Sequence, residues 1–507
     1  MVVQENLLEK KKRQSMFLMG IPTAAVLILF CFIPMFRWLL LAFREYSPMR
    51  ETGGSPWVGL KNFQDVLSLP YFGKLVFNTL LLGGVPLAFG TILTFGLTVG
   101  ISSVRKNWLQ GLILGLAALP AAIPSSFWVN ILPREILMNA QYSRLAAVVH
   151  GTLTFSAFGA VAGVLACKCT VDKRKAIWVA AGSACVGLML VFSPSREYIG
   201  GVHNPAVYET MDVLDTFSYR KGLMETQYGY DAAVTGIKTL FQLFSGTVGA
   251  VGLILLGSRK AEQRIQSEKS FWPAVLLAVL PAAAVIWMLA VQFGGEKLPN
   301  DAMMQAALVR SLGIGLAAAV LLAGFGGFAA CSLCSGSRIA IVFFMLGVVF
   351  SGGVQAWYFQ ARIVGLVNTL PAVVMGMIPG CAAFGFFLYL SAGKTGGIGI
   401  LCWIKENIPS LIAAAGFAFA AGFGNSVLPR ALLTDREKYP LSLIWNTVRM
   451  AQTGGTAEGN FSMPWVVLIP AAVVFAGVFA AVLVRSRRTE ELACAQAAEK
   501  KTADLEK

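Results

Sequence analysis

Two pairs of cysteines have a spacing that could hold a metal ion. One residue separates Cys167 from Cys169, and two residues separate Cys331 from Cys334. A structural zinc site needs four thiolate or imidazole ligands, and neither pair has a second pair at zinc-site spacing. The chain has nine cysteines and two histidines. We interpret the cysteines as small apolar packing residues and predict no metal site.

The tripeptide Gly393-Lys394-Thr395 resembles the end of a phosphate-binding loop. That motif requires a glycine five positions before Gly393, where this chain has Leu388, and it requires a strand–loop–helix context. No zinc-protease pair, nucleophile elbow or Ser-His-Asp set accompanies it. The sequence therefore predicts no catalytic residues and no cofactor held by this chain, and thus a protein that is not an enzyme.

Polar side chains within apolar stretches are the other candidates, because burying them in a membrane is costly and they often serve a pathway or a partner. For Arg37, Lys238 and Arg310, near the ends of stretches, we favour snorkelling toward the membrane surface. Three uncharged residues are candidates for a polar substrate pathway, and helix–helix hydrogen bonds explain them equally well. These are Gln242, Gln355 and Asn425.

Composition indicates what must position these residues. Hydrophobic residues make up 56% of the 507, charged residues only 13%, and the mean hydropathy is +0.68. A soluble fold could not bury so much apolar surface, and in lipid helices satisfy their own backbone polar groups. The 52 glycines suit close helix contact in a bilayer. We predict an all-α polytopic membrane protein.

Apolar stretches of membrane-spanning length number about twelve, six on each side of a charged run at 257–272. This predicts a first transmembrane domain at 1–256, a charged cytoplasmic linker at 257–270, a second transmembrane domain at 271–484 and a charged cytoplasmic tail at 485–507. The predicted spans are 16–41, 74–102, 108–132, 145–166, 176–192, 232–256, 271–291, 306–331, 339–357, 369–390, 408–423 and 465–484.

Charge sets the predicted orientation. Residues 10–13 are Lys-Lys-Lys-Arg and precede the first span, which places the N-terminus in the cytoplasm by the positive-inside rule. An even number of spans places the C-terminus on the same side. The net charge of +15 is scattered over short loops. That distribution favours a membrane partner over a nucleic-acid surface.

Motifs in both halves resemble one family. In the first half they are Ile33-Pro-Met, Ala42-Phe-Arg-Glu-Tyr-Ser-Pro, Gly54-Ser-Pro-Trp-Val-Gly-Leu-Lys-Asn-Phe, Asn204-Pro-Ala-Val-Tyr-Glu-Thr-Met-Asp and Gln227-Tyr-Gly-Tyr-Asp. In the second they are Phe350-Ser-Gly-Gly-Val, Gly365-Leu-Val-Asn-Thr-Leu, Gly424-Asn-Ser and Leu432-Leu-Thr-Asp-Arg-Glu-Lys-Tyr-Pro. They resemble the membrane subunits of bacterial binding-protein-dependent ABC importers of the sugar-uptake type. In that family two such permease subunits are separate chains, and here they look fused. Asn425 matches a family asparagine at the outer end of the penultimate span.

The family's coupling loop, which begins Glu-Ala-Ala and docks on the ATPase, is missing or degenerate here. Its first slot, at 167–175, is too short and ends in Lys173, Arg174 and Lys175. In the second slot, Ala392, Gly396 and Pro409 fit the motif, but Leu390 and Ser391 replace its first residues, and another register fits equally well.

The resemblance implies a multi-pass permease of the bacterial cell membrane. It would import saccharides with separate ATPase subunits, which alone bind ATP, and an external solute-binding lipoprotein. The degenerate loops suggest an alternative, a derived and non-transporting scaffold, assembly partner or sensor. A third hypothesis, an ion-coupled secondary transporter, would require buried acidic residues that the predicted spans almost lack.

Overall fold

The computed structural model describes residues 2–505, apart from 47–54, 169–171, 203, 352, 393–399, 454–460, 463 and most of 258–301. The predicted linker at 257–270 and the predicted seventh span at 271–291 therefore lie almost entirely outside the described residues. The chain is an all-α polytopic membrane protein, with a two-residue parallel pairing of β1 (Glu296–Lys297) and β2 (Phe461–Ser462) as its described sheet.

The helices follow the predicted spans closely. Those of the first half are α1 (Val2–Leu18), α2 (Ile21–Leu27), α3 (Ile33–Leu41), α5 (Lys61–Leu67), α6 (Phe72–Ser102), α7 (Asn107–Ala122), α8 (Ser125–Ile131), α9 (Arg134–Met138), α10 (Ala140–Ala166), α11 (Lys173–Leu188), α12 (Arg196–Val202), α13 (Tyr208–Met211), α14 (Leu214–Tyr219) and α15 (Tyr228–Gly257). Those of the second half are α17 (Ala302–Cys334), α18 (Arg338–Phe350), α19 (Val354–Ile363), α20 (Leu370–Met375), α21 (Cys381–Ser391), α22 (Ile400–Phe423), α23 (Val427–Leu432), α24 (Leu441–Thr453) and α25 (Pro464–Leu505).

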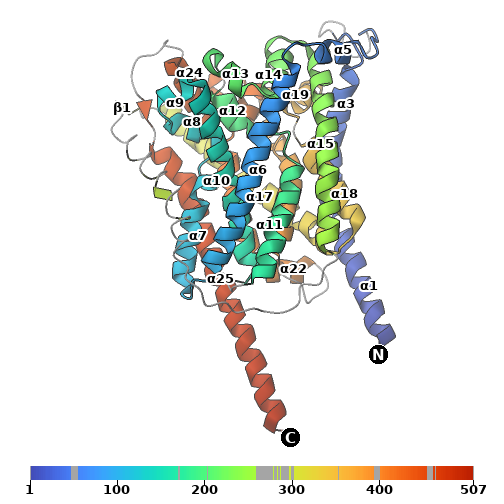
Figure 1. Cartoon of the computed structure of the whole chain (residues 1–507), viewed down its shortest axis with the longest axis vertical. Helices are drawn as coiled ribbons and strands as arrows, with labels where there is room; N and C mark the ends of the chain where they lie inside the picture. Colours follow the sequence, from blue (N-terminus) through green and yellow to red (C-terminus); the bar gives the residue numbers. More distant parts are fainter. Residues whose placement is uncertain are drawn as a thin grey trace.

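Among the described residues, eight helices are long and apolar enough to cross a membrane, and two bent pairs raise the number to ten. The predicted fifth span corresponds to α11, whose 16 residues are too few for it to be counted among these helices. Both termini project from the same end of the bundle, and the short helices gather at the opposite, far end (Figure 1). The position of both termini at one end of the bundle agrees with the predicted topology. The assignment of that end to the cytoplasm stays a prediction.

The third predicted span of each half is bent sharply. The axes of α7 and α8 differ by 83°, and those of α18 and α19 by 82°. Pro124 causes the first bend, because the residue before a proline avoids the helical region, and Ile123 has a ψ of 117°. The second bend follows Ser351, at Gly353, whose φ of −99° and ψ of 78° leave the helix. Each half of the chain therefore has a bent span at the third predicted position.

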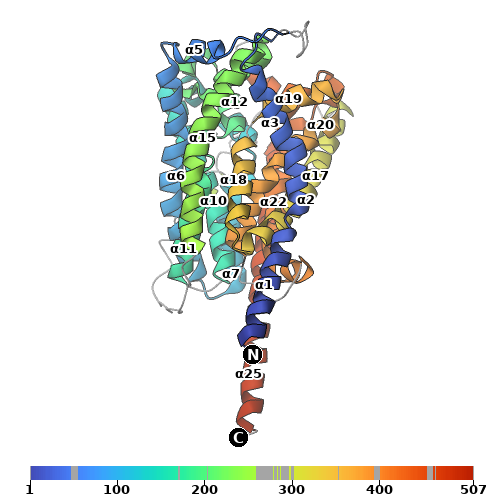
Figure 2. The same cartoon turned by 90° about the vertical axis from the view of Figure 1, so that its right-hand side faces the viewer.

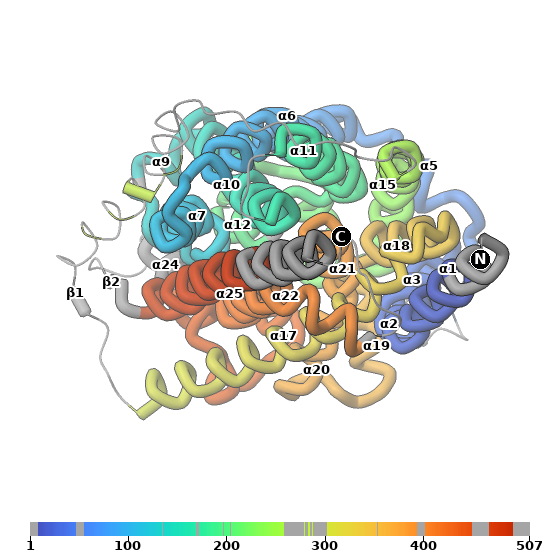
Figure 3. The backbone as a smooth tube through the Cα atoms, turned by 90° about the horizontal axis from the view of Figure 1, so that it is seen from below, coloured from blue at the N-terminus to red at the C-terminus, as the bar shows by residue number. Residues whose placement is uncertain are grey.

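The halves pack side by side along their length. Seen at 90° to the first view, α6, α11 and α15 lie on one side and α17 and α20 on the other, with α10, α18 and α22 between them (Figure 2). From the end that carries the termini, α25 of the second half runs beside α7 of the first (Figure 3). Predicted span one also crosses over, because α1 and α2 contact α17 and α3 contacts α19.

Small residues permit the contact between α25 and α7. A Cβ atom on Gly111 would come within 2.9 Å of the Phe479 ring, and one on Gly115 within 2.7 Å of the Phe475 ring. The two phenylalanines therefore occupy the spaces left by two glycines one helical turn apart. This is the small-residue packing that replaces the hydrophobic effect between helices in lipid.

Proline also interrupts α22, near the end that carries the termini. Pro409 lacks an N–H, so the carbonyl of Lys405, four residues earlier, loses its helical donor, and Asn407 leaves the helix with a φ of −114°. Arginines of α25 replace the missing donors. Arg488 donates to the Lys405 carbonyl, and Arg485 donates to the carbonyls of Glu406 at 3.1 Å and Leu165 at 3.2 Å.

Arg485 therefore ties α25 to the interrupted α22 and to the last turn of α10. It is 6% exposed, although it begins the predicted solvated tail. We expect Arg485→Ala to lower the free energy of unfolding by about 3 kcal/mol, because two charge-assisted hydrogen bonds are lost and their acceptors stay buried. Thermal unfolding in detergent, followed with a thiol-reactive dye on the buried cysteines, measures this. The exposed neighbour Arg487→Ala is the control, and an equal loss there would contradict the assignment.

Candidate functional site

A cavity of about 380 Å³ lies where the two bent spans meet. Pro124 and Ser125 come from the first bend, and Ser351 and Gly353 come from the second. Residues of both halves therefore line the cavity. Its volume falls within the ~300–1,000 Å³ usual for small-molecule sites. Backbone away from regular helix is tolerated at membrane depth where it lines such a cavity.

A π-helical turn in the first span supplies one wall. Residues Ile28–Phe32 form the turn directly before Pro34, whose ring and missing N–H disturb the preceding helical hydrogen bonds. Phe30 and Cys31 of this turn, with Pro34 and Met35, line the cavity. The proline motif Ile33-Pro-Met thus shapes the site.

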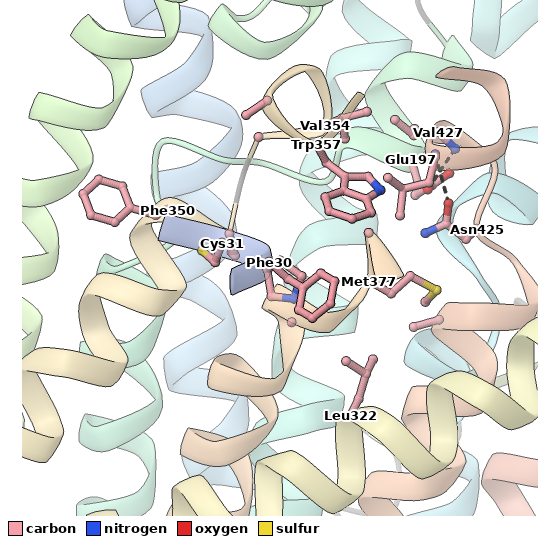
Figure 4. A pocket seen from close by; sticks show the side chains of 18 of the residues that line it. Phe30, Cys31, Glu197, Leu322, Phe350, Val354, Trp357, Met377, Asn425 and Val427 are labelled. Carbon is pink, nitrogen blue, oxygen red and sulfur yellow. Dashed lines mark hydrogen bonds between the residues drawn. The ribbon is translucent and has the colours of Figure 1, made fainter. Parts of the chain in front are cut away.

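Aromatic and other apolar side chains dominate the wall. The ring of Trp357, on α19, lies 5.8 Å from the ring of Phe30, and Met377 and Leu322 face the same space (Figure 4). The Trp357 indole N–H donates to the Ala372 carbonyl at 2.8 Å, which fixes the ring while leaving its apolar surface on the cavity. Such a wall suits a ligand that presents C–H faces to a rigid aromatic ring.

Glu197 forms a polar latch between the halves at the edge of the cavity. This residue of α12 accepts hydrogen bonds from the Ser426 N–H at 3.1 Å and the Ser426 hydroxyl at 2.5 Å. It also accepts one from the Val427 N–H at 3.1 Å (Figure 4). Burial raises the pKa of the Glu197 carboxyl, and hydrogen bonds from Ser426 and Val427 and the charge of Arg430 oppose that shift. Three donors directed at its oxygens match the ionised form.

Asn425 lines the cavity beside this latch, where its amide nitrogen faces the open space (Figure 4). Its side-chain oxygen accepts from the Leu428 N–H at 3.1 Å, and its carbonyl accepts from the Ser442 hydroxyl at 2.6 Å. The preceding Gly424 lies so close to the first bend that a Cβ there would be 1.9 Å from Pro124. Asn425 is therefore the predicted pathway residue that the structure places on the cavity wall.

Gln355 lies near the cavity but points into a buried polar cluster. Its amide donates to the Ser218 hydroxyl of α14 at 3.1 Å, and that hydroxyl also bonds to Asp231 and Thr235 of α15. Asp231 is fully buried, one residue before the predicted sixth span. The cluster joins α19 of the second half to the first half, which fits the helix–helix interpretation of Gln355.

Gln242 is also fully buried and away from the cavity wall. It donates to the Met189 carbonyl at 2.8 Å and accepts from the Ser193 hydroxyl at 3.3 Å. Lys238, one turn earlier on α15, donates to Asp215 at 2.5 Å and to Ser193 at 3.1 Å. Lys238 is 4% exposed. The snorkelling prediction for it was wrong, because Asp215 supplies a buried counter-charge that local sequence did not reveal.

The other two cations meet partners as well. Arg37 stays exposed on the bundle surface and donates to the Gln360 side chain at 2.9 Å, which links the first span to α19. Arg310 donates to the Tyr439 carbonyl at 3.3 Å. Gln360 and Tyr439 both belong to the second half, so Arg37 adds another polar contact between halves.

The predicted coupling-loop positions lie at the end that carries the termini. Only residues 167–172 connect α10 to α11, and Lys173, Arg174 and Lys175 form the first turn of α11. Asp172 caps that turn by accepting from the Lys175 N–H at 3.1 Å. Ala392 follows the end of α21, and Pro409 lies just past the interruption of α22. Gly396 lies outside the described residues.

Glu197 and Trp357 are site residues that the sequence analysis missed. Glu197 lies in the polar connection between the predicted spans at 176–192 and 232–256 and reads as a surface carboxylate. Trp357 ends a predicted apolar span and reads as a packing residue. Their shared position on one cavity depends on two bends more than 200 residues apart in the chain, so no local pattern could reveal it.

Comparison with known proteins finds similarity over about half of the chain. No protein-family model matches the chain. Protein LplB of Bacillus subtilis (strain 168) is 24% identical over 304 residues, which cover 52% of this chain and 92% of LplB. The polygalacturonan/rhamnogalacturonan transport system permease protein YteP of the same organism is 25% identical over 305 residues, covering 50% of this chain and 92% of YteP.

A solved structure gives a weaker likeness. One chain of a bacterial alginate ABC transporter, crystallised with an alginate pentasaccharide-bound periplasmic protein, is 20% identical and has a TM-score of 0.36. The match covers 48% of this chain and 93% of that chain. In all three comparisons a nearly complete relative corresponds to about half of the present chain.

The latch makes a testable contribution to stability. We expect Glu197→Ala to lower the free energy of unfolding by about 3 kcal/mol, because the Ser426 and Val427 donors lose a charged acceptor. Glu197→Gln should cost less, since one oxygen remains. Unfolding in detergent measures both variants. Glu209→Ala, which removes an exposed carboxylate paired with Lys74, should leave stability unchanged, and a loss equal to that of Glu197→Ala would contradict the latch.

Proposed function

We propose that this chain is the membrane-spanning permease component of an ABC-type importer for saccharides. Separate ATPase subunits would bind and hydrolyse ATP, and an external binding protein would deliver the substrate. The two halves would form the translocation pathway between them, with both termini in the cytoplasm.

The cavity between the bent spans is the observation that carries this proposal. Its wall combines the aromatic ring of Trp357 with the uncharged amide of Asn425 and with small hydroxyl residues such as Ser125 and Ser351. Aromatic surfaces and hydrogen-bonding groups together suit a sugar ring, which has apolar C–H faces and polar edges. The similarity to YteP, a permease of a polysaccharide transport system, supports the same substrate class.

Alternating access requires that the two halves separate and rejoin around a central site. The polar contacts across the cavity are suited to such a change, because hydrogen bonds can exchange one partner for another or for water. Glu197 bonds to Ser426 and Val427, and the Ser126 hydroxyl donates to the Gly424 carbonyl at 2.7 Å. We infer that breaking these contacts would open the cavity toward the far end, where the binding protein would dock.

One observation favours the alternative, a non-transporting membrane component that keeps the permease scaffold. The connection at 167–172 leaves no room for a docking helix in the first half. An ATPase without differential contact to the two states of a permease could not shift the balance between them. The second half has the interrupted start of α22 at the corresponding place, held by Arg485 and Arg488.

Recruitment of an ATPase separates the two functions. We expect the tagged full-length chain, purified from its host membrane in mild detergent, to carry an ABC ATPase identifiable by mass spectrometry. Addition of the binding protein and saccharide should then stimulate ATP hydrolysis in lipid vesicles. A clean preparation without ATPase would refute import. Recovery of ATPase binding after a complete coupling loop is grafted between Ala166 and Lys173 would then establish the alternative.

A further inference from the structure

The cavity wall carries a single charged side chain among the described residues that form it. That side chain is the carboxylate of Glu197. The remaining lining residues are apolar or uncharged, with Ser125, Ser195, Ser351 and Asn425 as the polar ones. No lysine or arginine of the described chain belongs to the wall. The described part of the wall therefore offers an anion no counter-charge.

Glu197 holds its charge through contacts that a ligand would not replace easily. The Ser426 and Val427 N–H groups and the Ser426 hydroxyl all donate to it. Arg430, on α23, acts on the same carboxylate and weakens its field, but Arg430 does not line the cavity. Glu197 thus belongs to the wall that a ligand would contact, whereas Arg430 lies outside that wall.

An acidic sugar would meet two obstacles here. Its carboxylate would lose hydration against an apolar wall that offers no cation, and a buried unpaired charge is strongly disfavoured. It would also be repelled by Glu197 at short range, where partial burial reduces screening. A neutral sugar would meet neither obstacle and would still find Trp357 and Asn425.

We propose that the cavity selects uncharged saccharides and excludes uronates, with Glu197 as the residue that sets this specificity. The inference rests on the proposed function and narrows it. It also separates this chain from YteP, whose name includes polygalacturonan, a polymer of uronic acid.

A matched pair of ligands tests the selectivity. Trigalacturonate and its full methyl ester have the same rings and linkages and differ in charge. Binding of each to the full-length chain in lipid nanodiscs is measured by saturation-transfer NMR at constant ionic strength. We expect the ester to bind at least about tenfold more tightly, which corresponds to two unit charges several ångströms apart in a partly buried site.

Placing a cation in the wall should reverse the preference. Ser351 is suitable because it lines the cavity and its hydroxyl bonds within its own turn, to the Val348 carbonyl at 2.7 Å. Ser351→Lys should raise the affinity for trigalacturonate relative to the ester, whereas Ser351→Met, of similar length and no charge, should keep the native order. An equal shift in both variants would show that size and not charge decides.

The possible results distinguish the proposed charge selectivity from the proposed saccharide function on which it rests. Tighter binding of the ester supports both. Equal binding, or a preference for the free acid, overturns the selectivity and leaves saccharide binding intact. Binding of neither ligand overturns both the selectivity and the saccharide assignment of the cavity.

Discussion

The carbonyl groups that lose their helical N–H donor at a proline need another hydrogen-bond donor, and this need constrains the packing of the helices. In a bilayer no water can satisfy a carbonyl that has lost its helical donor, so the protein must supply one. Pro124 frees the carbonyl of Pro120, and the Trp128 indole N–H donates to it at 3.0 Å. Pro409 frees the carbonyl of Lys405, which accepts from Arg488. Each interruption is stable because a side chain elsewhere reaches back to it.

The need to satisfy backbone groups also explains why the two bent spans, broken at Pro124 and at Gly353, face one another inside the bundle. A helix break exposed to lipid would leave polar backbone unsatisfied, whereas two breaks turned inward protect each other. The contact of Gly424 with Pro124 and the hydrogen bond from Ser126 to Gly424 show how closely the end of α22 approaches the first bend. The space that remains between the bends is the cavity. The same constraint that stabilises the bundle therefore creates the candidate site.

Charges inside the bundle follow a related rule. Lys238 and Asp215 are paired, Arg485 serves helix carbonyls, and Glu197 serves backbone N–H groups of the other half. Most of these groups join segments distant in the chain, so they specify which helices meet. Of these charged residues, Glu197 also lines the cavity, whereas Lys238, Asp215 and Arg485 do not. A charge there bears on what the cavity accepts as well as on how the halves join.

The sequence alone determined the class of the protein, because its apolar stretches are long and their number and length follow directly from composition along the chain. It also indicated two repeated halves, the resemblance to saccharide importers and the shortened connection at 167–175. Asn425 was predicted from a motif and lies on the cavity wall. These features are local, so each can be read from a few neighbouring residues.

Only the tertiary structure decided the rest. Three polar contacts join residues that are between 23 and 229 positions apart in the chain. They are the contacts of Lys238 with Asp215, Glu197 with Ser426 and Arg485 with Glu406. Gln242 and Gln355 resembled Asn425 in sequence, yet they turn into buried hydrogen-bond clusters. Which polar group faces a cavity depends on helix rotation and on the bends opposite it. Helix rotation and the position of the opposite bends are set by packing between distant segments, so the local sequence cannot predict them.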